Sequence, residues 1–156
     1  MSSAARVGAV AKLTVKNLVH DGSQYTLRFS EKGGKSREIP VRHDLEHFLL
    51  GYLQAANVTE GPLFRTANRK TRTLTNNAMT GIDVCRMMKR RLKAAGLPGH
   101  FPPHSFRVVT VTDLLEQNLP LEDVQYLAGH ADPRTTRIYD RRRRKVTRNI
   151  VERISI

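Results

Sequence analysis

Residues 127–141 read Leu-Ala-Gly-His-Ala-Asp-Pro-Arg-Thr-Thr-Arg-Ile-Tyr-Asp-Arg, and this stretch constrains the fold of the chain more than any other. Gly129 follows a run of helix-forming residues, where glycine commonly closes a helix. Asp132 can cap the free N–H groups of a new helix, and Pro133 suits the first position of that helix. The segment therefore predicts two short helices joined by a glycine turn, the second of which leads to Tyr139.

The remainder of the chain predicts a mainly α-helical fold with one small antiparallel β-hairpin. Two segments alternate apolar with polar neighbours, as half-buried strands do, and the paired glycines between them suit a tight connection. The alternating positions are Tyr25, Leu27 and Phe29 in the first segment and Arg37, Ile39 and Val41 in the second. Amphipathic spacing and turn signals predict helices over residues 4–13, 45–53, 82–95, 105–117, 121–128 and 146–156, besides the helix that starts at Asp132.

The composition describes one domain with a strong positive charge. We expect a single domain over residues 1–156. The one cysteine, Cys85, excludes an internal disulfide, and no apolar run reaches the length of a membrane span, so we expect a cytoplasmic protein. Lys and Arg number 27 against 14 Asp and Glu, a net charge of +13. Such an excess predicts a polyanionic partner, most commonly nucleic acid, although a ribosomal or membrane-surface protein also fits.

A metal site is one chemistry that the sequence suggests. Residues 43–47, His-Asp-Leu-Glu-His, match the HxxEH pattern of one class of zinc protease. The solvated face of an amphipathic helix explains the same residues, and a five-residue pattern with no evident third ligand is weak evidence. We therefore expect no metal ligands and no cofactor, and we expect Cys85 to be a small core residue.

Three short motifs in the last third of the chain carry a combined meaning that none has alone. They are His104-Ser105-Phe106-Arg107, Gly129-His130 and Thr135-Thr136-Arg137-Ile138-Tyr139. A capped histidine, a glycine turn and a half-buried tyrosine explain them one at a time. Together they supply cations for the non-bridging oxygens of a phosphodiester, where charge builds in the transition state. They also supply a tyrosine, whose phenolate can attack phosphorus and leave again.

In order and spacing these motifs resemble the tyrosine recombinase, or phage integrase, family. The family carries His-x-x-Arg, then Gly-His, then a nucleophilic tyrosine, and its signature segment is similar to residues 127–141 almost residue for residue. Its catalytic lysine lies at a β-hairpin tip in the context Lys-Gly-x-Lys-x-Arg, which residues 32–37 match, with Lys32 first and Lys35 beside it. The segment that opens with Arg6 resembles the one that holds the family's first arginine.

The resemblance covers residues 4–145 and implies a catalytic domain that cleaves and rejoins DNA through a 3′-phosphotyrosyl intermediate, without metal or ATP. It implies that Tyr139 attacks the phosphodiester, that Lys32 protonates the leaving 5′ oxygen, and that His104 assists proton movement at Tyr139. The implied catalytic set is Arg6, Lys32, His104, Arg107, His130 and Tyr139, of which Arg6, Arg107 and His130 hold the phosphoryl oxygens. The expected DNA contacts are Lys35, Arg37, Arg86, Lys89, Arg90, Arg137 and Arg141. The run 86–93 is equally well explained as the wet side of a helix.

The chain departs from the family pattern in two places. Ala9 stands where the family often has an acidic residue, three positions after its first arginine. The family's N-terminal DNA-clamping domain has no counterpart before Arg6, so we expect an N-terminally truncated catalytic domain. A catalytically impaired DNA-binding module is the alternative function. A type IB topoisomerase uses a similar residue set, and a basic RNA-binding protein accounts for the charge but not for the ordered motifs.

Double-stranded DNA is the partner that the resemblance implies, in a bacterial, phage or mobile-element setting. In the family, the segment after the tyrosine helix often docks on a neighbouring subunit of a DNA-bound tetramer. In this chain Val146, Ile150 and Ile154 form an apolar stripe in the tail, residues 146–156. The stripe suits a groove on a neighbouring subunit, which predicts a homotetramer on DNA, or it folds back on its own domain.

Overall fold

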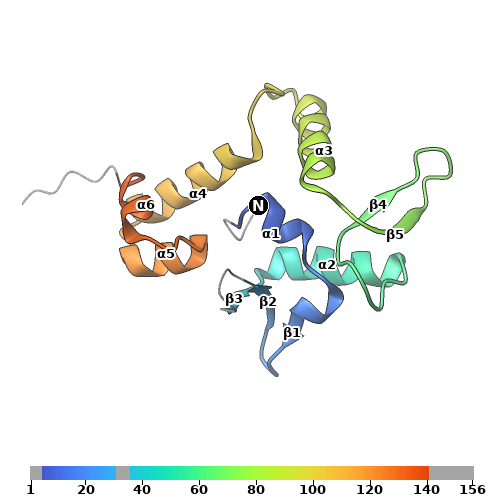
Figure 1. The fold of residues 1–156 in the computed structure, drawn as a ribbon, viewed down its shortest axis with the longest axis horizontal. Coiled ribbons are helices and arrows are strands. Elements are labelled where there is room, and N and C mark those ends of the chain that lie inside the picture. The colour runs from blue at the N-terminus through green and yellow to red at the C-terminus, as the bar shows by residue number, and fades with distance from the viewer. Residues whose placement is uncertain (1–4, 31–35, 141–156) are drawn as a thin grey trace, which may run out of the picture.

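The computed structural model describes residues 5–30 and 36–140, which contain six α-helices and two antiparallel sheets (Figure 1). The helices are α1 (Val7–Ala11), α2 (His43–Ala55), α3 (Gly81–Ala94), α4 (Pro103–Glu116), α5 (Leu121–Ala128) and α6 (Pro133–Arg137). The strands are β1 (Leu18–His20), β2 (Tyr25–Ser30), β3 (Ser36–Pro40), β4 (Arg65–Ala67) and β5 (Leu74–Ala78), and a 3-10 turn, η1 (Val15–Asn17), precedes β1. The predicted fold class, mainly helical with small antiparallel sheets, is confirmed. The tail helix predicted over 146–156 lies outside the described residues.

The β2–β3 hairpin has the alternation that the sequence predicts. Phe29 on β2 pairs with Arg37 on β3, and Leu27 pairs with Ile39. Because side chains alternate across a strand, these four residues share the buried face of the sheet. That face belongs to a first core cluster, whose buried members are Ala5, Leu13, Leu27, Phe29, Ile39, Val41, Leu49 and Leu63.

Residues that the sequence predicts to begin or end helices are found at the helix ends. Gly96, with φ +69°, follows the end of α3, and the carboxylate of Asp132 accepts a hydrogen bond of 2.8 Å from the Arg134 N–H at the start of α6. Helix α1 is shorter than the predicted 4–13. It ends at Ala11: the N–H of Leu13 donates to the carbonyl of Val10, only three residues back, and the carbonyl of Leu13 accepts from the N–H of Leu63 at 2.9 Å.

The strands β1, β4 and β5 were not predicted from the sequence. Strand β1 has three residues, too few to show alternation. Strands β4 and β5 pair through their backbones and carry mainly polar side chains: the hydroxyls of Thr66 and Thr75 lie 2.6 Å apart, and most of β5 is exposed. Such a pair has no alternating apolar face for a sequence pattern to reveal.

Helices α4, α5 and α6 form a separate group at one end of the molecule (Figure 1). Their own core cluster contains Val111, Leu115, Val124 and Ala128 as its buried members. Leu127 on α5 packs against both this cluster and the first one. The contact between the C-terminal end of α5 and the β2–β3 hairpin therefore joins the two clusters.

Within residues 5–30 and 36–140, no helix combines the length and apolar composition that crossing a bilayer requires. The helices α3 and α4 have 14 residues each, whereas a membrane span takes about 20.

Candidate active site

Arg107 is the most buried cation among the members of the expected catalytic set that the structure describes. It lies on α4, a helix that begins at Pro103, and only 5% of its surface is exposed. Burial lowers the pKa of Arg107, and the nearby positive charges of Arg6 and Arg37 lower it further, while Tyr139 opposes the shift. Because an arginine stays protonated even so, α4 presents a fixed positive charge next to Tyr139.

His130 is held by contacts on both its backbone and its ring. It follows Gly129, whose φ of +64° ends α5 in the left-handed region. Its N–H donates to the carbonyl of Gln125 at 3.2 Å, and the Gln125 amide donates back to its carbonyl at 3.0 Å. Its Nδ1 lies 2.8 Å from the hydroxyl of Thr136, so the ring has one orientation inside the domain, where 7% of the residue is exposed.

The charge state of His130 follows from these surroundings. Burial lowers its pKa to about 4, and the positive charges of Arg107 and Arg6 add to that shift. The imidazole is therefore neutral at pH 7 in the DNA-free protein. His130 is therefore an uncharged hydrogen-bonding group beside two cations, Arg107 and Arg6.

Tyr139 lies immediately after α6, half-buried against the second core cluster. Its N–H donates to the carbonyl of Thr136 at 3.1 Å. Its ring stacks on the imidazole of His130, with 6.0 Å between ring centroids and 12° between ring planes. The tyrosine that the resemblance implies as nucleophile thus lies next to His130.

Arg6 comes from the opposite end of the chain and reaches the same place. It is the N-cap residue of α1, and its Nη1 donates to the carbonyl of Gly129 at 3.2 Å. This carbonyl orients Arg6 in a chain that has Ala9 where the family often has an acid. A cavity of about 270 Å³ beside it is lined by Ala5, Arg6, Val7, Cys85, Pro102, Pro103, His104 and Arg107.

The described residues therefore bring together five of the six expected catalytic positions, namely Arg6, His104, Arg107, His130 and Tyr139. The exposed His104 opens α4, lines the same cavity as Arg6 and Arg107, and contributes to the lowered pKa of His130. Cationic and hydrogen-bonding groups around a tyrosine suit attack on a phosphodiester. Lys32, Lys35 and Arg141 lie outside the described residues.

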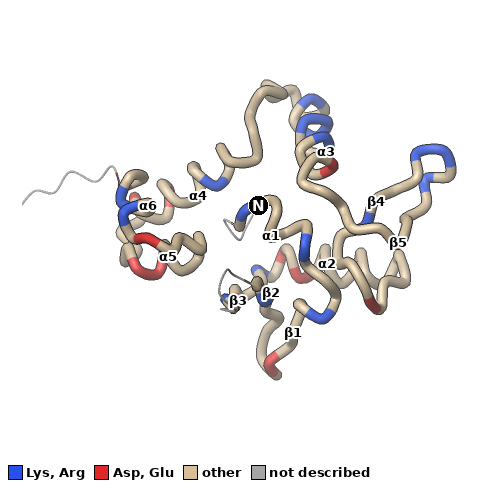
Figure 2. The backbone as a smooth tube through the Cα atoms, in the orientation of Figure 1, with Lys and Arg blue, Asp and Glu red and all other residues tan. Residues whose placement is uncertain are grey.

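The cations expected to contact DNA divide into two kinds. Arg86, Lys89 and Arg90 are exposed on α3, and because Lys89 and Arg90 follow Arg86 by three and four residues, the three share one face of the helix. Arg137 is exposed on α6. Figure 2 shows in blue that basic residues recur along α3. Arg37 differs from the expectation, since it is only 5% exposed and donates to the carbonyls of Tyr126 and Leu127. Because those donors face the protein interior, we do not place Arg37 among the DNA contacts.

Some residues of the site were not singled out from the sequence. Thr136 is fully buried, and its hydroxyl is hydrogen-bonded to His130. Its position in the sequence, between the Gly129-His130 pair and Tyr139, was the one feature that could have indicated this role. A further group of cations, Arg69, Lys70 and Arg72, is exposed at the tip of the β4–β5 hairpin (Figure 2). The sequence did not single out this group because it did not predict the two strands that form the hairpin.

The residues of the HxxEH pattern lie on α2, where His43 and His47 are exposed. Among residues 5–30 and 36–140, no group of three or more His, Cys, Asp and Glu side chains is arranged to hold a metal ion. Cys85, expected in the core, is half-buried at the wall of the cavity next to Arg6.

Comparison with known proteins gives relatives of one kind. Tyrosine recombinase XerA of Pyrococcus furiosus is 29% identical over 151 residues, which cover 97% of this chain and 50% of the relative. Tyrosine recombinase XerD of Xanthomonas campestris is 33% identical over 129 residues, which cover 74% of this chain and 38% of the relative. The chain thus spans half or less of the length of these curated relatives.

Solved structures of site-specific recombinases also match this chain. XerH site-specific recombinase, bound to palindromic difH substrate in a post-cleavage complex, matches with a TM-score of 0.71 and 26% identity. That match covers 88% of this chain and 38% of XerH. XerA recombinase, 21% identical, shares the fold with a TM-score of 0.71 over 96% of this chain and 52% of its own. The model of the phage integrase family matches residues 1–145, nearly the whole sequence, and the chain therefore belongs to the phage integrase family.

Proposed function

We propose that this chain is the catalytic domain of a site-specific DNA recombinase that breaks and rejoins DNA strands. One observation supports this most directly: Tyr139 stacks on His130 at a site where Arg107 and Arg6 place two positive charges. Such a cluster matches the needs of a phosphodiester that gains negative charge as it is attacked. The names of the relatives, tyrosine recombinases, agree with this chemistry.

The proposed reaction has two balanced steps. The phenol oxygen of Tyr139 loses its proton, with the assistance of His104, and attacks phosphorus. The bond from phosphorus to the 5′ oxygen breaks, and Lys32 donates a proton to that oxygen, which leaves a 3′-phosphotyrosyl link and a free 5′ hydroxyl. A 5′ hydroxyl of a second strand then attacks the link, which restores the phosphodiester and the tyrosine without ATP.

Each cation in the site has a distinct part in this scheme. Arg6 and Arg107 hold the non-bridging oxygens, and the charge of Arg107 acts more strongly on them than it would in water, because the residue is buried in a medium of low polarity. His130, neutral in the free protein, contributes a hydrogen bond, and a bound phosphate favours its protonation. The exposed cations of α3 and Arg137 bind the flanking backbone phosphates.

The partner in this proposal is double-stranded DNA in the cytoplasm, in a bacterial, phage or mobile-element setting. Four copies assemble on DNA, with the tail, residues 146–156, of one copy docked on the next. Removal of residues 146–156 is expected to leave DNA binding intact and to abolish assembly of several copies on one duplex. Sedimentation of the protein with and without duplex DNA measures this.

The decisive experiment uses a pool of end-labelled duplexes that carry a nick in one strand and random sequence around it. After cleavage next to the nick, the short 5′-hydroxyl fragment diffuses away, so the covalent protein–DNA adduct accumulates and is seen on a denaturing gel. Mass spectrometry is expected to place the adduct on Tyr139, with Tyr139→Phe inactive and Tyr25→Phe active. Binding to the same pool without any adduct would favour the DNA-binding module instead.

A further inference from the structure

Arg37 is a buried cation for which the proposed reaction has no direct use. It is the second residue of β3, opposite Phe29 on β2, on the core-facing side of the sheet. An arginine at such a position is costly to bury unless its donors are occupied. Its contacts therefore indicate what it does.

The guanidinium of Arg37, which comes from β3, contacts the last turn of α5. Its Nη1 donates to the carbonyl of Tyr126 at 2.9 Å and to that of Leu127. Carbonyls in the last turn of a helix lack their usual partners four residues on, and a positive charge there is favoured by the helix dipole. Arg37 thus acts as a C-terminal cap that comes from a distant strand.

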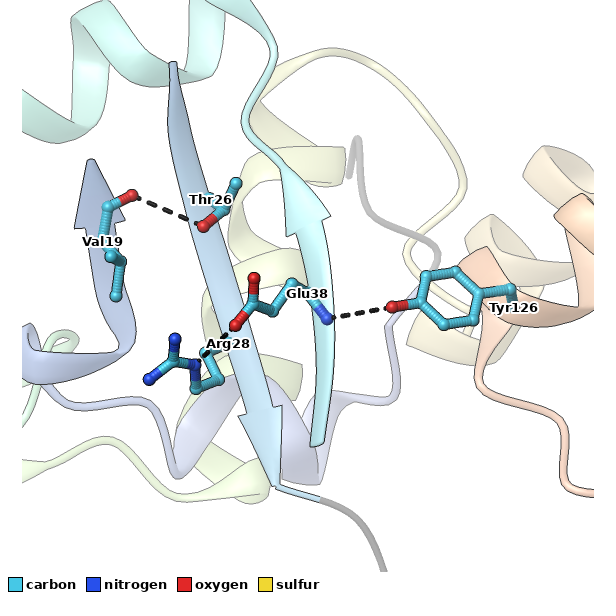
Figure 3. Close-up of polar contacts among 5 residues, drawn as sticks. All are labelled: Val19, Thr26, Arg28, Glu38 and Tyr126. Carbon is cyan, nitrogen blue, oxygen red and sulfur yellow. Dashed lines mark hydrogen bonds and ion pairs between the residues drawn. The ribbon is translucent and has the colours of Figure 1, made fainter. Parts of the chain in front are cut away.

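Two further contacts fix the place of this cap. The guanidinium lies over the ring of Phe29, with 5.2 Å from its Cζ to the ring centroid. Beside it, the N–H of Glu38 donates to the phenol oxygen of Tyr126 at 3.3 Å, which ties β3 to α5 a second time (Figure 3). The end of α5 is therefore fastened to the hairpin by polar contacts on adjacent residues of β3.

Gly129 lies directly against the guanidinium of Arg37. A Cβ at position 129 would come within 2.7 Å of Cζ and 2.9 Å of both terminal nitrogens, closer than real Cβ contacts. Only glycine fits there without displacing the guanidinium of Arg37 from its present position. The same residue offers its carbonyl to Arg6 and is followed by His130, so the position of Gly129 sets two parts of the site.

We propose that Arg37 is a positioning residue, which holds the Gly129–His130 turn against the β2–β3 hairpin and thereby aligns Arg6 and His130 with Tyr139. It acts through this turn and does not touch the DNA. The catalytic part of this inference rests on the proposed function, whereas the clamp on Gly129 is independent of it.

The first test separates positioning from DNA contact. Arg37→Met is compared with Arg28→Met, which removes an exposed arginine from the neighbouring strand of the same sheet. For Arg37→Met we expect the rate of adduct formation at saturating nicked duplex to fall about 10²-fold, the effect of a small misplacement, with the Kd for DNA changed less than about threefold. Arg28→Met is expected to cleave at the normal rate. A raised Kd with an unchanged saturated rate would overturn the proposal.

The second test needs no catalysis. Gly129→Ala and Gly96→Ala both place a side chain at positive φ, +64° and +69°, but a Cβ at 96 meets nothing within 4 Å. We expect Gly129→Ala to lower the urea midpoint more than Gly96→Ala does, and we expect that excess to vanish in the Arg37→Met background. Equal losses at the two glycines, or an excess that persists without Arg37, would contradict the clamp.

The two tests also keep the inference apart from the proposed function. If the wild-type chain forms no adduct, the function fails, and the glycine pair still decides whether Arg37 is the clamp. If Arg37→Met does not fold, Gly129→Ala in the wild-type background supplies the displaced turn. Its adduct rate relative to Gly96→Ala then gives the effect of the turn on cleavage, and equal rates would overturn the positioning role.

Discussion

Thr136 contacts both His130 and Tyr139, through its side chain and its backbone respectively. Its hydroxyl lies 2.8 Å from Nδ1 of His130, and its carbonyl accepts from the N–H of Tyr139 at 3.1 Å. The two aromatic rings stack nearly parallel as a result. A single buried threonine of α6 therefore fixes the imidazole and the proposed nucleophile relative to each other.

Thr136→Val keeps the volume of this side chain and removes its hydroxyl. Since the hydroxyl is fully buried, we expect a loss of about 1–3 kcal/mol in the free energy of unfolding, measured by urea denaturation. The adduct rate at saturating DNA is also expected to fall. Thr135→Val, one residue away and only half-buried, is the matched control; an equal loss in both variants would contradict the special role of Thr136.

The imidazole of His130 is expected to titrate at about pH 4 in the DNA-free protein, because burial and the charges of Arg107 and Arg6 oppose its protonation. An NMR pH titration of the histidine ring signals measures this. Adding a duplex brings negative charge to the site and is expected to move the midpoint upward. A midpoint near the ordinary 6.5 in the free protein would show that the ring is not enclosed as described.

The same shift has a consequence for stability. His130 binds a proton below about pH 6.5 when unfolded but only near pH 4 when folded, so its contribution is present above pH 6.5 and is lost as the pH falls towards 4. The full effect is roughly 3 kcal/mol. Urea denaturation at pH 7 and pH 4.5 is expected to show a smaller difference for His130→Gln than for wild type. His43→Gln, on the exposed face of α2, is expected to behave as wild type.

Cleavage is expected to continue in the presence of EDTA. Arg6 and Arg107 supply the positive charge that two divalent ions supply in many nucleases. The measurement is adduct formation on the nicked duplex pool with EDTA and with added magnesium. Strand cleavage that requires magnesium and leaves no covalent adduct would indicate hydrolytic nuclease chemistry and would remove Tyr139 from the role of nucleophile.

Lys32 and Lys35 are expected to differ in kind. If Lys32 protonates the leaving oxygen, Lys32→Ala slows cleavage by roughly 10²- to 10⁴-fold. A duplex with sulfur in place of the leaving 5′ oxygen needs no such proton, so the variant is expected to cleave it at nearly the normal rate. Lys35→Ala is expected to weaken binding on both substrates. Equal defects of Lys32→Ala on both substrates would exclude it as the acid.

Much of this fold could be predicted because its signals are local. The alternation through Phe29 and Ile39 predicted the hairpin, and Asp132 with Pro133 predicted the start of α6. The order of His104, Arg107, His130 and Tyr139 in the sequence predicted a shared site, and the structure brings them together at one cavity and one ring stack. Short-range patterns were sufficient to predict an element wherever apolar residues repeated at a fixed spacing or a capping residue marked the start of a helix.

The remaining features depend on contacts between distant residues. Arg37 was expected to contact DNA from its hairpin context, although its place in the alternation with Ile39 already put it on the core-facing side. Its carbonyl partners, Tyr126 and Leu127, lie about 90 residues away, where no local pattern reaches. The lowered pKa of His130 likewise depends on arginines that only the fold brings near.

The residues of the candidate site come from distant parts of the sequence. Arg6 and the carbonyl that it contacts, that of Gly129, are 123 residues apart, and Tyr139 follows ten residues later. A protease cut between α3 and α4 separates Arg6 from the segment that carries His130 and Tyr139. The candidate site therefore exists only where both segments are held in one folded molecule, and the strand breakage proposed above is confined to such molecules.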